Sequence, residues 1–404
     1  MNTPVGIYVS IPFCKAKCSF CNFASDVFGS ERMDSYIDRL CREIVSARHE
    51  AQRTGAVLEA SADSVYFGGG TPSLLSPDQF RRIFTALRGE FHISQEAEIT
   101  VECAPGQLSS ETLEALQREG MNRVSLGVQS FVDREARTVG RLHTGPECEA
   151  EIARLQAAGV SKTGLDLIVG LPHQTEASWR ESVDRALESG VGHISVYMLE
   201  VDEDSRLGRE ALAGGVRYGA GDLPHEDDVA EWYEMGCELL QKAGTGQYEI
   251  SNFARDGERS LHNMKYWRRL PYIGFGLDAH SMLLSENGSV RFQNPDGMNV
   301  YMNDPTGPFP MVGVEAQERP VERVSREAAF EESIFLGLRL NAGVRLTDLR
   351  ESFGVEMVES LMPSMAEVCE AGLLTMDEER IRLTAKGRLA SNEVFSRLLV
   401  AAAV

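Results

Sequence analysis

Six short segments rich in β-branched and aromatic residues recur through the first half of the chain, and a helix-length stretch follows each one. The expected strands cover residues 7–11, 64–67, 99–101, 124–128, 165–169 and 194–198. Between them lie amphipathic patterns with helix start signals, such as Ser76 and Pro77 before Phe80. Strands that alternate with helices form parallel sheets with right-handed crossovers. The pattern therefore predicts an α/β fold with a partial (β/α)6 barrel similar to a TIM barrel, and a doubly wound open sheet is the alternative.

The second half of the chain predicts a change of architecture. Residues 285–325 carry clusters of Asn, Gly, Pro and Asp without a long periodic segment, which indicates an irregular connection. From residue 326 the expected order is three helices, a hairpin and a helix, which is typical of a winged-helix-like α+β domain. We therefore divide the 404 residues into a barrel domain at 1–284, a connection at 285–325 and a C-terminal domain at 326–404.

The chain is strongly acidic, with 40 Lys and Arg against 61 Asp and Glu and a formal net charge of -21. Such a field repels nucleic acid and anionic lipid, so neither is an expected partner. Residues 325–404 hold 9 basic and 13 acidic residues, a net of -4, so we interpret the C-terminal domain as a lid or docking surface rather than a DNA reader. No stretch approaches the ~18 apolar residues of a membrane helix and no signal peptide begins the sequence. A cytoplasmic location without a membrane span is expected.

Three of the eight cysteines lie within eight residues, directly after the first expected strand. The spacing is Cys14-x3-Cys18-x2-Cys21. A zinc site needs a fourth ligand, and the nearest candidates, Cys41 and His49, lie far along an expected helix. Cys18 and Cys21 could form a redox pair, although the context of a thioredoxin site is missing. A [4Fe-4S] cluster bound by three thiolates leaves one iron open to a small molecule with an amine and a carboxylate, and this interpretation is favoured.

Further polar or glycine-rich motifs follow the successive expected strands. They are Gly68-Gly69-Gly70 after the second, Glu102 at the end of the third, Gln129 after the fourth with Arg141 beyond the next helix, and Asp166 in the fifth. Each has an ordinary explanation, such as a tight turn, a helix cap or a salt bridge. In a parallel barrel, however, these positions converge on one mouth, where such folds place their sites.

The cysteine triplet in the loop after the first strand resembles the signature of the radical S-adenosylmethionine (SAM) superfamily. The resemblance extends over almost the whole chain to the oxygen-independent coproporphyrinogen III oxidase family, and within it to a heme-chaperone branch. The stretches that carry it are residues 67–73, 98–105, 122–131, 166–172, 248–254, 262–267 and 383–388. The resemblance implies a radical SAM barrel that binds a [4Fe-4S] cluster and SAM.

The resemblance also implies roles for individual residues. Cys14, Cys18 and Cys21 would hold the cluster, and Gly69, Gly70, Thr71 and Glu102 would receive SAM, with Tyr8 and Phe20 packed nearby. Gln129, Arg141 and Asp166 match positions that line a second SAM site in the decarboxylating relatives. Whether this chain uses a second SAM is open.

Two features separate the chaperone branch from the decarboxylating oxidases. The oxidases have a fourth cysteine where this chain has Phe23, and a long arm before the cluster where only thirteen residues precede Cys14. In the chaperone branch, His262, Tyr266 and Trp267 would bind heme through an imidazole and flat apolar rings, and His280 is a second candidate ligand.

We therefore expect a heme chaperone that passes heme to heme-requiring respiratory proteins in the membrane. The first alternative is radical decarboxylation of coproporphyrinogen III in porphyrin biosynthesis, and the second is an iron-sulfur scaffold that neither binds heme nor catalyses a reaction.

Overall fold

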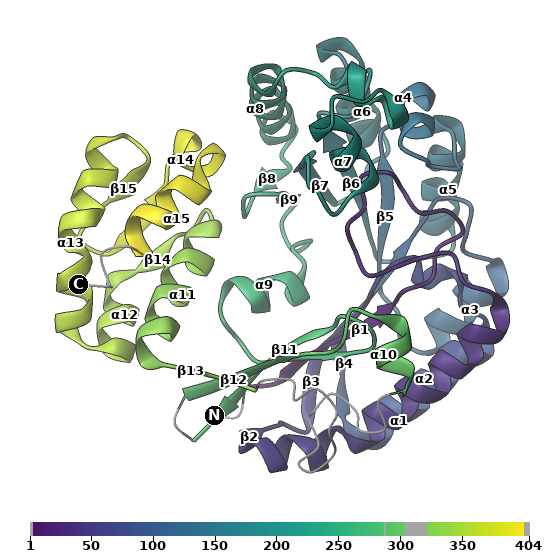
Figure 1. Cartoon of the computed structure of the whole chain (residues 1–404), viewed down its shortest axis with the longest axis horizontal. Coiled ribbons are helices and arrows are strands. Elements are labelled where there is room, and N and C mark those ends of the chain that lie inside the picture. The colour runs from purple at the N-terminus through teal and green to yellow at the C-terminus, as the bar shows by residue number, and fades with distance from the viewer. Residues whose placement is uncertain (1–2, 287, 304–320, 400–404) are drawn as a thin grey trace.

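The computed structural model describes residues 3–286, 288–303 and 321–399 of the chain (Figure 1). Its centre is a curved run of parallel strands in which neighbours in the chain are neighbours in the sheet. These strands are β1 (Val5–Ile11), β3 (Ser61–Gly69), β4 (His92–Cys103), β5 (Arg123–Gln129), β6 (Lys162–Val169) and β7 (His193–Met198). They contain all six expected strands, so the prediction of a parallel α/β barrel is confirmed.

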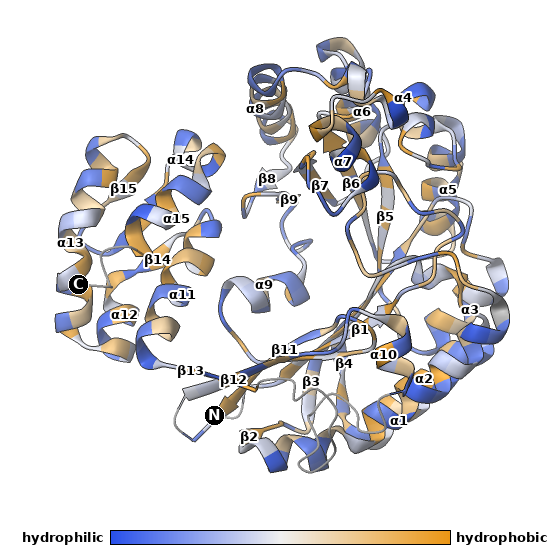
Figure 2. Cartoon of the chain, viewed as in Figure 1, coloured by the Kyte–Doolittle hydropathy of each residue, from blue (hydrophilic) through white to orange (hydrophobic). Residues whose placement is uncertain are grey.

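Helices cover the convex side of this sheet (Figure 1). They are α1 (Ser30–Thr54), α2 (Pro77–Glu90), α3 (Ser110–Arg118), α4 (Asp133–Thr138), α5 (Gly145–Ala157) and α6 (Glu176–Glu188). Helix α2 begins as predicted, because Ser76 and Gln79 form a capping box and Pro77 occupies the first turn. Its apolar face packs on the sheet, and Phe80 and Phe84 contact the ring of Phe67. Figure 2 shows the resulting contrast between apolar inner faces and polar outer faces of the helices.

The barrel stays open, and further strands, all but β10 antiparallel to their neighbours, extend both ends of the run from β1 to β7. On one side lie β10 (Tyr272–Phe275), parallel to β1, then β11 (His280–Ser285), β12 (Gly288–Gln293) and β13 (Glu322–Val324), and β2 (Ala56–Val57) also pairs with β11. On the other side lie β9 (Asn252–Ala254) and β8 (Gly246–Gln247). Helix α9 (Leu261–Trp267) lies on the concave side (Figure 1). The strand order has two ends rather than a closing pair, so the barrel is partial as predicted.

The segment predicted to be an irregular connection contains regular structure. Strand β12, helix α10 (Met298–Asn303) and strand β13 all lie within residues 285–325, while residues 304–320 lie outside the described part of the chain. Strand β12 buries Val290 and Phe292 and is paired along its length with β11. Six residues are too few to give a clear periodic signal. The strand is stabilised by its pairing with β11, which cannot be recognised from the local sequence.

Three further helices follow β7 before the chain reaches the C-terminal part. They are α7 (Arg206–Leu212), the 3-10 helix η2 (Arg217–Asp222) and α8 (Glu226–Lys242), and another 3-10 helix, η1 (Pro72–Leu74), follows the glycine loop after β3. No helix among the described residues has the length and apolar character needed to cross a membrane.

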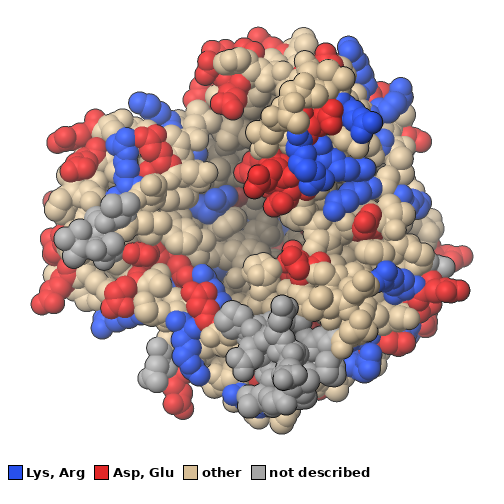
Figure 3. Space-filling model, viewed as in Figure 1, with Lys and Arg blue, Asp and Glu red and all other residues tan. Residues whose placement is uncertain are grey.

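The C-terminal part has the helix and hairpin order expected of a winged-helix-like α+β unit. Its elements are α11 (Arg326–Arg339), β14 (Val344–Arg345), α12 (Leu346–Phe353), α13 (Val355–Glu370), β15 (Leu374–Met376), β16 (Arg380–Leu383), α14 (Ala385–Leu389) and α15 (Ser391–Leu399). The three strands form a small antiparallel sheet in the order β14-β16-β15. Phe330, Leu338, Met365 and Ile381 belong to a core separate from that of the barrel. Figure 3 shows a hollow in the molecular face between this part and the barrel.

Candidate functional site

The loop that follows β1 is closed into a compact turn next to the glycine loop that follows β3. The backbone N–H of Cys14 donates to Asp26 and that of Asp26 donates to Pro12, each at 3.0 Å, which closes the base of the turn. The N–H of Gly70 donates to Ile11 at 2.8 Å, and that of Thr71 donates to Phe13 at 2.7 Å. The two loops therefore run side by side at the carboxyl ends of β1 and β3.

All three predicted cluster cysteines lie on this turn, with Cys18 buried and Cys14 and Cys21 partly buried. Burial raises the pKa of Cys14 and of Cys21, a hydrogen bond with Ser25 opposes the rise in both, and the nearby Cys18 thiol adds to it because neighbouring thiolates would repel one another. The hydroxyl of Thr71 donates to the sulfur of Cys14 at 3.9 Å. The three thiols thus lie on one compact turn and are partly shielded from solvent, which suits ligands of one soft-metal centre.

Their arrangement also bears on the kind of metal centre. Within the described part of the chain, no three His, Cys, Asp or Glu side chains converge closely enough to hold a single metal ion. In a cubane cluster each thiolate binds a different iron, so the sulfurs need not meet at one point. Three thiolates can bind three irons of a [4Fe-4S] cluster, whereas a structural zinc ion takes four protein ligands, so this donor set fits the cluster better.

The glycine loop has no room for side chains. A Cβ atom at Gly70 would lie 2.7 Å from the carbonyl oxygen of Phe13 and 3.0 Å from the sulfur of Cys14, and Gly69 has a φ of +105°. A Cβ atom at Gly68 would lie 3.0 Å from a carboxylate oxygen of Glu102. Main-chain groups in this loop can therefore approach a ligand beside the cysteines closely.

Glu102, at the carboxyl end of β4, faces the same loop. Its carboxylate accepts hydrogen bonds from the hydroxyl of Tyr66 at 2.8 Å and from the N–H of Gly69 at 3.2 Å. Burial raises the pKa of Glu102 to about 7, and the nearby charge of Asp166 adds to the rise, while the two hydrogen bonds oppose it. The group can accept hydrogen bonds from a ligand with hydroxyl or ammonium donors.

The structure brings Gln129, Arg141 and Asp166 together on the other side of the mouth. Gln129 follows a bulge in β5 and has a φ of +68°, a conformation that costs free energy outside glycine. Arg141 donates to the carbonyl of Gly127 and, at 3.4 Å, to the sulfur of Cys18. Burial raises the pKa of Asp166, while hydrogen bonds from Ser195 and Ser125 and the charge of Arg141 lower it. The three residues, two predicted from strands and one from the segment beyond the next helix, therefore surround one region beside the cluster loop.

The two aromatic residues expected near SAM lie in different surroundings. Tyr8 stacks on Tyr66, with ring centroids 6.1 Å apart, and so lies next to Glu102. Phe20 packs instead against Val139, Ile168 and Leu171, on the β6 side of the mouth. They lie on different sides of the site.

The predicted heme motif lies on α9, inside the barrel. His262 is 1% exposed, its Nδ1 is 3.0 Å from the hydroxyl of Ser64 and its Nε2 is 2.8 Å from the hydroxyl of Tyr266. Burial lowers the pKa of His262 to about 3, so the ring is neutral. Both ring nitrogens are engaged, so in this conformation His262 offers no nitrogen to an iron. His280, at the start of β11, is exposed.

Trp267 of the same motif faces away from His262. Its ring packs with Tyr248, Met264 and Leu340, and the guanidinium of Arg339 lies 4.3 Å from the ring centroid. The residues of the motif thus have different surroundings. His262 and Tyr266 lie inside the barrel, and Trp267 contacts the C-terminal part.

Apart from Glu102 and Asp166, sequence reasoning missed the polar lining of the barrel cavity. One cavity is lined by Ser260 at the start of α9, by Asn263 on that helix, and by the side chains of Tyr66, Thr100, Glu102, Arg123, Ser125, Asp166, His193 and Ser195. They occupy alternate positions on β3 to β7, and the residues between them are apolar and packed under the helices. The signal was present in the sequence as a period of two within each expected strand.

The segment between β7 and η2 also contributes unforeseen contacts, because it covers the cysteine loop. The N–H of Leu207 donates to the carbonyl of Ser19 at 2.8 Å, and the side chain of Asn22 donates to Asp202 at 2.8 Å. These residues are far apart in sequence and carry no motif, so only the folded chain reveals the contact.

Comparisons with known proteins show the family to which the chain belongs. Residues 8–186 match the family model described as the Radical SAM superfamily, and residues 324–390 match the HemN C-terminal domain. The fold matches a solved structure titled as coproporphyrinogen III oxidase (HemN) from Escherichia coli, a radical SAM enzyme, with a TM-score of 0.79 over 98% of this chain and 90% of that one at 24% identity. The chain is thus a radical SAM protein.

Similar curated proteins show to which branch of this superfamily the chain belongs. A protein named heme chaperone HemW from Lactococcus lactis is 32% identical over 99% of this chain and 98% of its own length, and one from Bacillus subtilis is 33% identical over 97% and 98%. The chain belongs to the oxygen-independent coproporphyrinogen III oxidase family and, within it, to the heme-chaperone branch whose members are called HemW.

Proposed function

We propose that the chain is a heme chaperone that binds a [4Fe-4S] cluster, SAM and heme, and passes heme to heme-dependent respiratory proteins in the membrane. The observation that carries this proposal is the similarity, over nearly the full length of both chains, to relatives named heme chaperone HemW. Phe23, which is 62% exposed where the oxidases have a fourth cysteine, supports the same branch.

In this proposal the mouth of the barrel holds the cluster and SAM. Cys14, Cys18 and Cys21 bind the cluster, and Gly69, Gly70, Thr71 and Glu102 receive SAM beside Tyr8 and Phe20. The cluster would leave one iron for the amine and carboxylate of SAM, and the chain orients the rest of the ligand through main-chain groups of the glycine loop and the Glu102 carboxylate. Gln129, Arg141 and Asp166 would line a second SAM site.

The cluster assignment has a direct test. Cys21→Ser removes one thiolate at the edge of the loop without disturbing the barrel core, so we expect loss of most of the iron and sulfide while the circular dichroism spectrum is kept. A variant with the iron and sulfide content of the unsubstituted protein would contradict the assignment of Cys21 as a ligand.

For heme, the predicted residues are His262, Tyr266 and Trp267, with His280 as the second candidate. Iron ligation by His262 requires Ser64 or Tyr266 to give up its hydrogen bond, whereas His280 is already exposed. Anaerobic heme titrations of His262→Ala and His280→Ala therefore decide between the two imidazoles. The variant that loses the absorption band of bound heme identifies the ligand.

The rival function, decarboxylation of coproporphyrinogen III, is suggested by the shared fold alone. The deciding experiment follows heme uptake and coproporphyrinogen decarboxylation in parallel on the same anaerobic preparation, with the Escherichia coli oxidase as positive control. Stable heme uptake without decarboxylation supports the chaperone. Porphyrin turnover comparable with that of the control would overturn it, and loss of both activities with iron retained would indicate a scaffold.

A further inference from the structure

Arg141 makes contacts that its expected place in a second SAM site does not explain. One guanidinium nitrogen, Nη1, donates to the sulfur of Cys18 at 3.4 Å, and the other, Nη2, donates to the carbonyl of Gly127. The remaining nitrogen, Nε, is buried without a partner among the described residues. The positive charge of Arg141 is therefore held against a cysteine of the cluster loop.

The backbone around Arg141 keeps it there. The loop that follows α4 is docked on the cysteine turn, because the N–H of Ser19 donates to the carbonyl of Val139 at 3.0 Å. Gly140 has a φ of +87°, and a Cβ atom there would lie 3.6 Å from the carbonyl oxygen of Lys17. The N–H of Arg141 itself donates to Ala136 at 2.9 Å. The contact with Cys18 thus follows from how two loops pack, and not only from the rotamer of a long side chain.

A cation in this place has a definite effect on a cluster bound by the triplet. One-electron reduction adds a negative charge to a centre that already carries three thiolates, in a chain of net charge -21. A fixed guanidinium and an N–H···S hydrogen bond stabilise the reduced form more than the oxidised form. We propose that Arg141 raises the reduction potential of the cluster through its contact with the thiolate of Cys18. It would act on the cluster through this ligand and not by direct contact with the irons.

Asp166 provides a second anion for the same guanidinium. Its carboxylate accepts hydrogen bonds from Ser125 at 3.2 and 3.3 Å, and the charge of Arg141 acts on it. The charge of Arg141 therefore acts on the Asp166 carboxylate as well as on the thiolate of Cys18, and substituting Arg141 removes compensation from both. This role is independent of heme and rests only on the cluster at Cys14, Cys18 and Cys21.

The test is a redox titration of the cluster followed by electron paramagnetic resonance, without SAM, so that a role in binding a second SAM cannot contribute. Arg141→Met should make reduction at least tenfold less favourable, which for one electron is a shift of about 59 mV to lower potential. Arg141→Lys keeps the charge and should restore part of the shift.

Arg206 provides a matched control, because it is held to the same loop without touching a sulfur. Its guanidinium donates to the carbonyl of Lys17 and lies 5.4 Å from the ring centroid of Tyr218. Arg206→Met should change the equilibrium constant for reduction of the cluster less than threefold. Equal shifts in reduction potential in the two Met variants would overturn the proposal. The shift would then come from the loss of any nearby positive charge and not from the contact with Cys18.

If Arg141→Met loses its iron, its reduction potential cannot be measured, and a second pair of variants tests the proposal. Arg141→Lys would then be compared with Arg206→Lys by the same titration, and the proposal requires the larger shift at Arg141, because an ammonium cannot reproduce the planar guanidinium contact to both Cys18 and Gly127. A negative result here leaves the heme proposal untouched, because the titration contains no heme.

Discussion

Among the residues proposed to receive SAM, Glu102 is the one whose protonation changes near neutral pH. Its pKa of about 7 means that the carboxyl gains a proton as the pH falls through 7, and a protonated carboxyl accepts hydrogen bonds more weakly. We expect the affinity for SAM, measured by anaerobic calorimetry, to fall below pH 7 by up to about tenfold per pH unit. Glu102→Gln should bind weakly at every pH. A wild-type affinity that does not change between pH 6 and pH 8 would contradict this role.

Gly70 shows how little space the cluster loop leaves. Gly70→Ala places a methyl group 2.7 and 2.9 Å from backbone atoms of Phe13 and 3.0 Å from the sulfur of Cys14, and backbone atoms cannot move aside cheaply. We expect the variant to keep its helical circular dichroism spectrum and to retain less than half of the iron. Gly89→Ala is the control, because a Cβ atom at Gly89 meets nothing within 4 Å and alanine favours helix α2. Equal iron content in both variants would show that the loop adapts.

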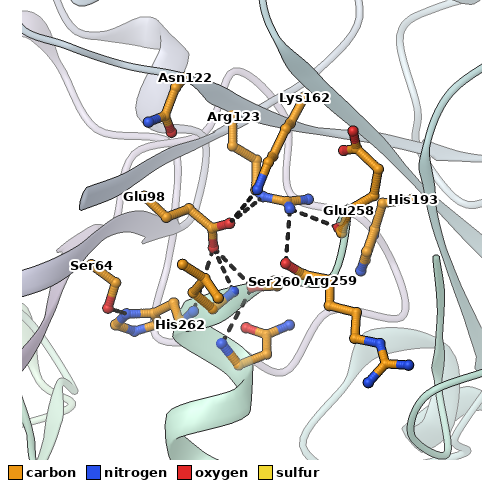
Figure 4. Close-up of polar contacts among 12 residues, drawn as sticks. Ser64, Glu98, Asn122, Arg123, Lys162, His193, Glu258, Arg259, Ser260 and His262 are labelled. Carbon is orange, nitrogen blue, oxygen red and sulfur yellow. Dashed lines mark hydrogen bonds and ion pairs between the residues drawn. The ribbon is translucent and has the colours of Figure 1, made fainter. Parts of the chain in front are cut away.

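At the scale of elements, α9 depends on the barrel for its stability. A seven-residue helix is marginal alone, and here Glu98 of β4 accepts from the N–H of Leu261 at 2.8 Å at its start. Glu98 is itself paired with Arg123 of β5 at 2.9 Å, and both are almost fully buried (Figure 4). Arg123 also donates to the carbonyl of Glu258, before α9, at 2.7 Å. The ion pair thus fixes the helix that carries His262.

Removing one partner of this pair should be costly. Among the described residues, Arg123→Met leaves the buried Glu98 carboxylate with one cation, Lys162 at 3.7 Å, and we expect a loss of about 3–5 kcal/mol in the free energy of unfolding by urea. Adding Glu98→Gln removes the stranded charge and should recover part of that loss. Arg118→Met, in an exposed pair with Glu114, should cost less than about 1 kcal/mol. The idea fails if the double variant is no more stable than Arg123→Met.

At the scale of the whole molecule, the sequence predicts what depends on neighbours along the chain. The six strands, the start of α2 and the helix and hairpin order after residue 325 follow from periodicity and caps, and the strand ends bring Cys14, Glu102 and Asp166 to one mouth. The partners of these residues come from elsewhere in the fold: Arg141 reaches Cys18 across 123 positions, and Ser64 meets His262 across 198. No local pattern encodes such pairs.

The seam between the barrel and the C-terminal part is another long-range contact. The N–H of Ile250 donates to the carbonyl of Arg339 at 3.1 Å, and that of Asn341 donates to Tyr248 at 3.0 Å, so the chain after β8 pairs with the end of α11. The Arg339 guanidinium lies over Trp267 and near the buried Glu249, whose pKa is raised by burial and lowered by that charge. A single side chain therefore links α9, the chain after β8 and the C-terminal part.

If Arg339 holds the seam, removing its charge should loosen the seam without unfolding either part. Arg339→Met loses a cation–π contact worth about 0.5–2 kcal/mol, so hydrogen exchange at the amides of Ile250 and Asn341 should accelerate by about 2- to 30-fold. Amides within β16, which pairs with β14 and β15 inside the C-terminal part, should keep their rates. Arg397→Met, in an exposed pair within α15, is the control and should change neither. Equal acceleration in β16 would mean that the C-terminal part itself had been destabilised, because seam opening exposes only the amides that cross it.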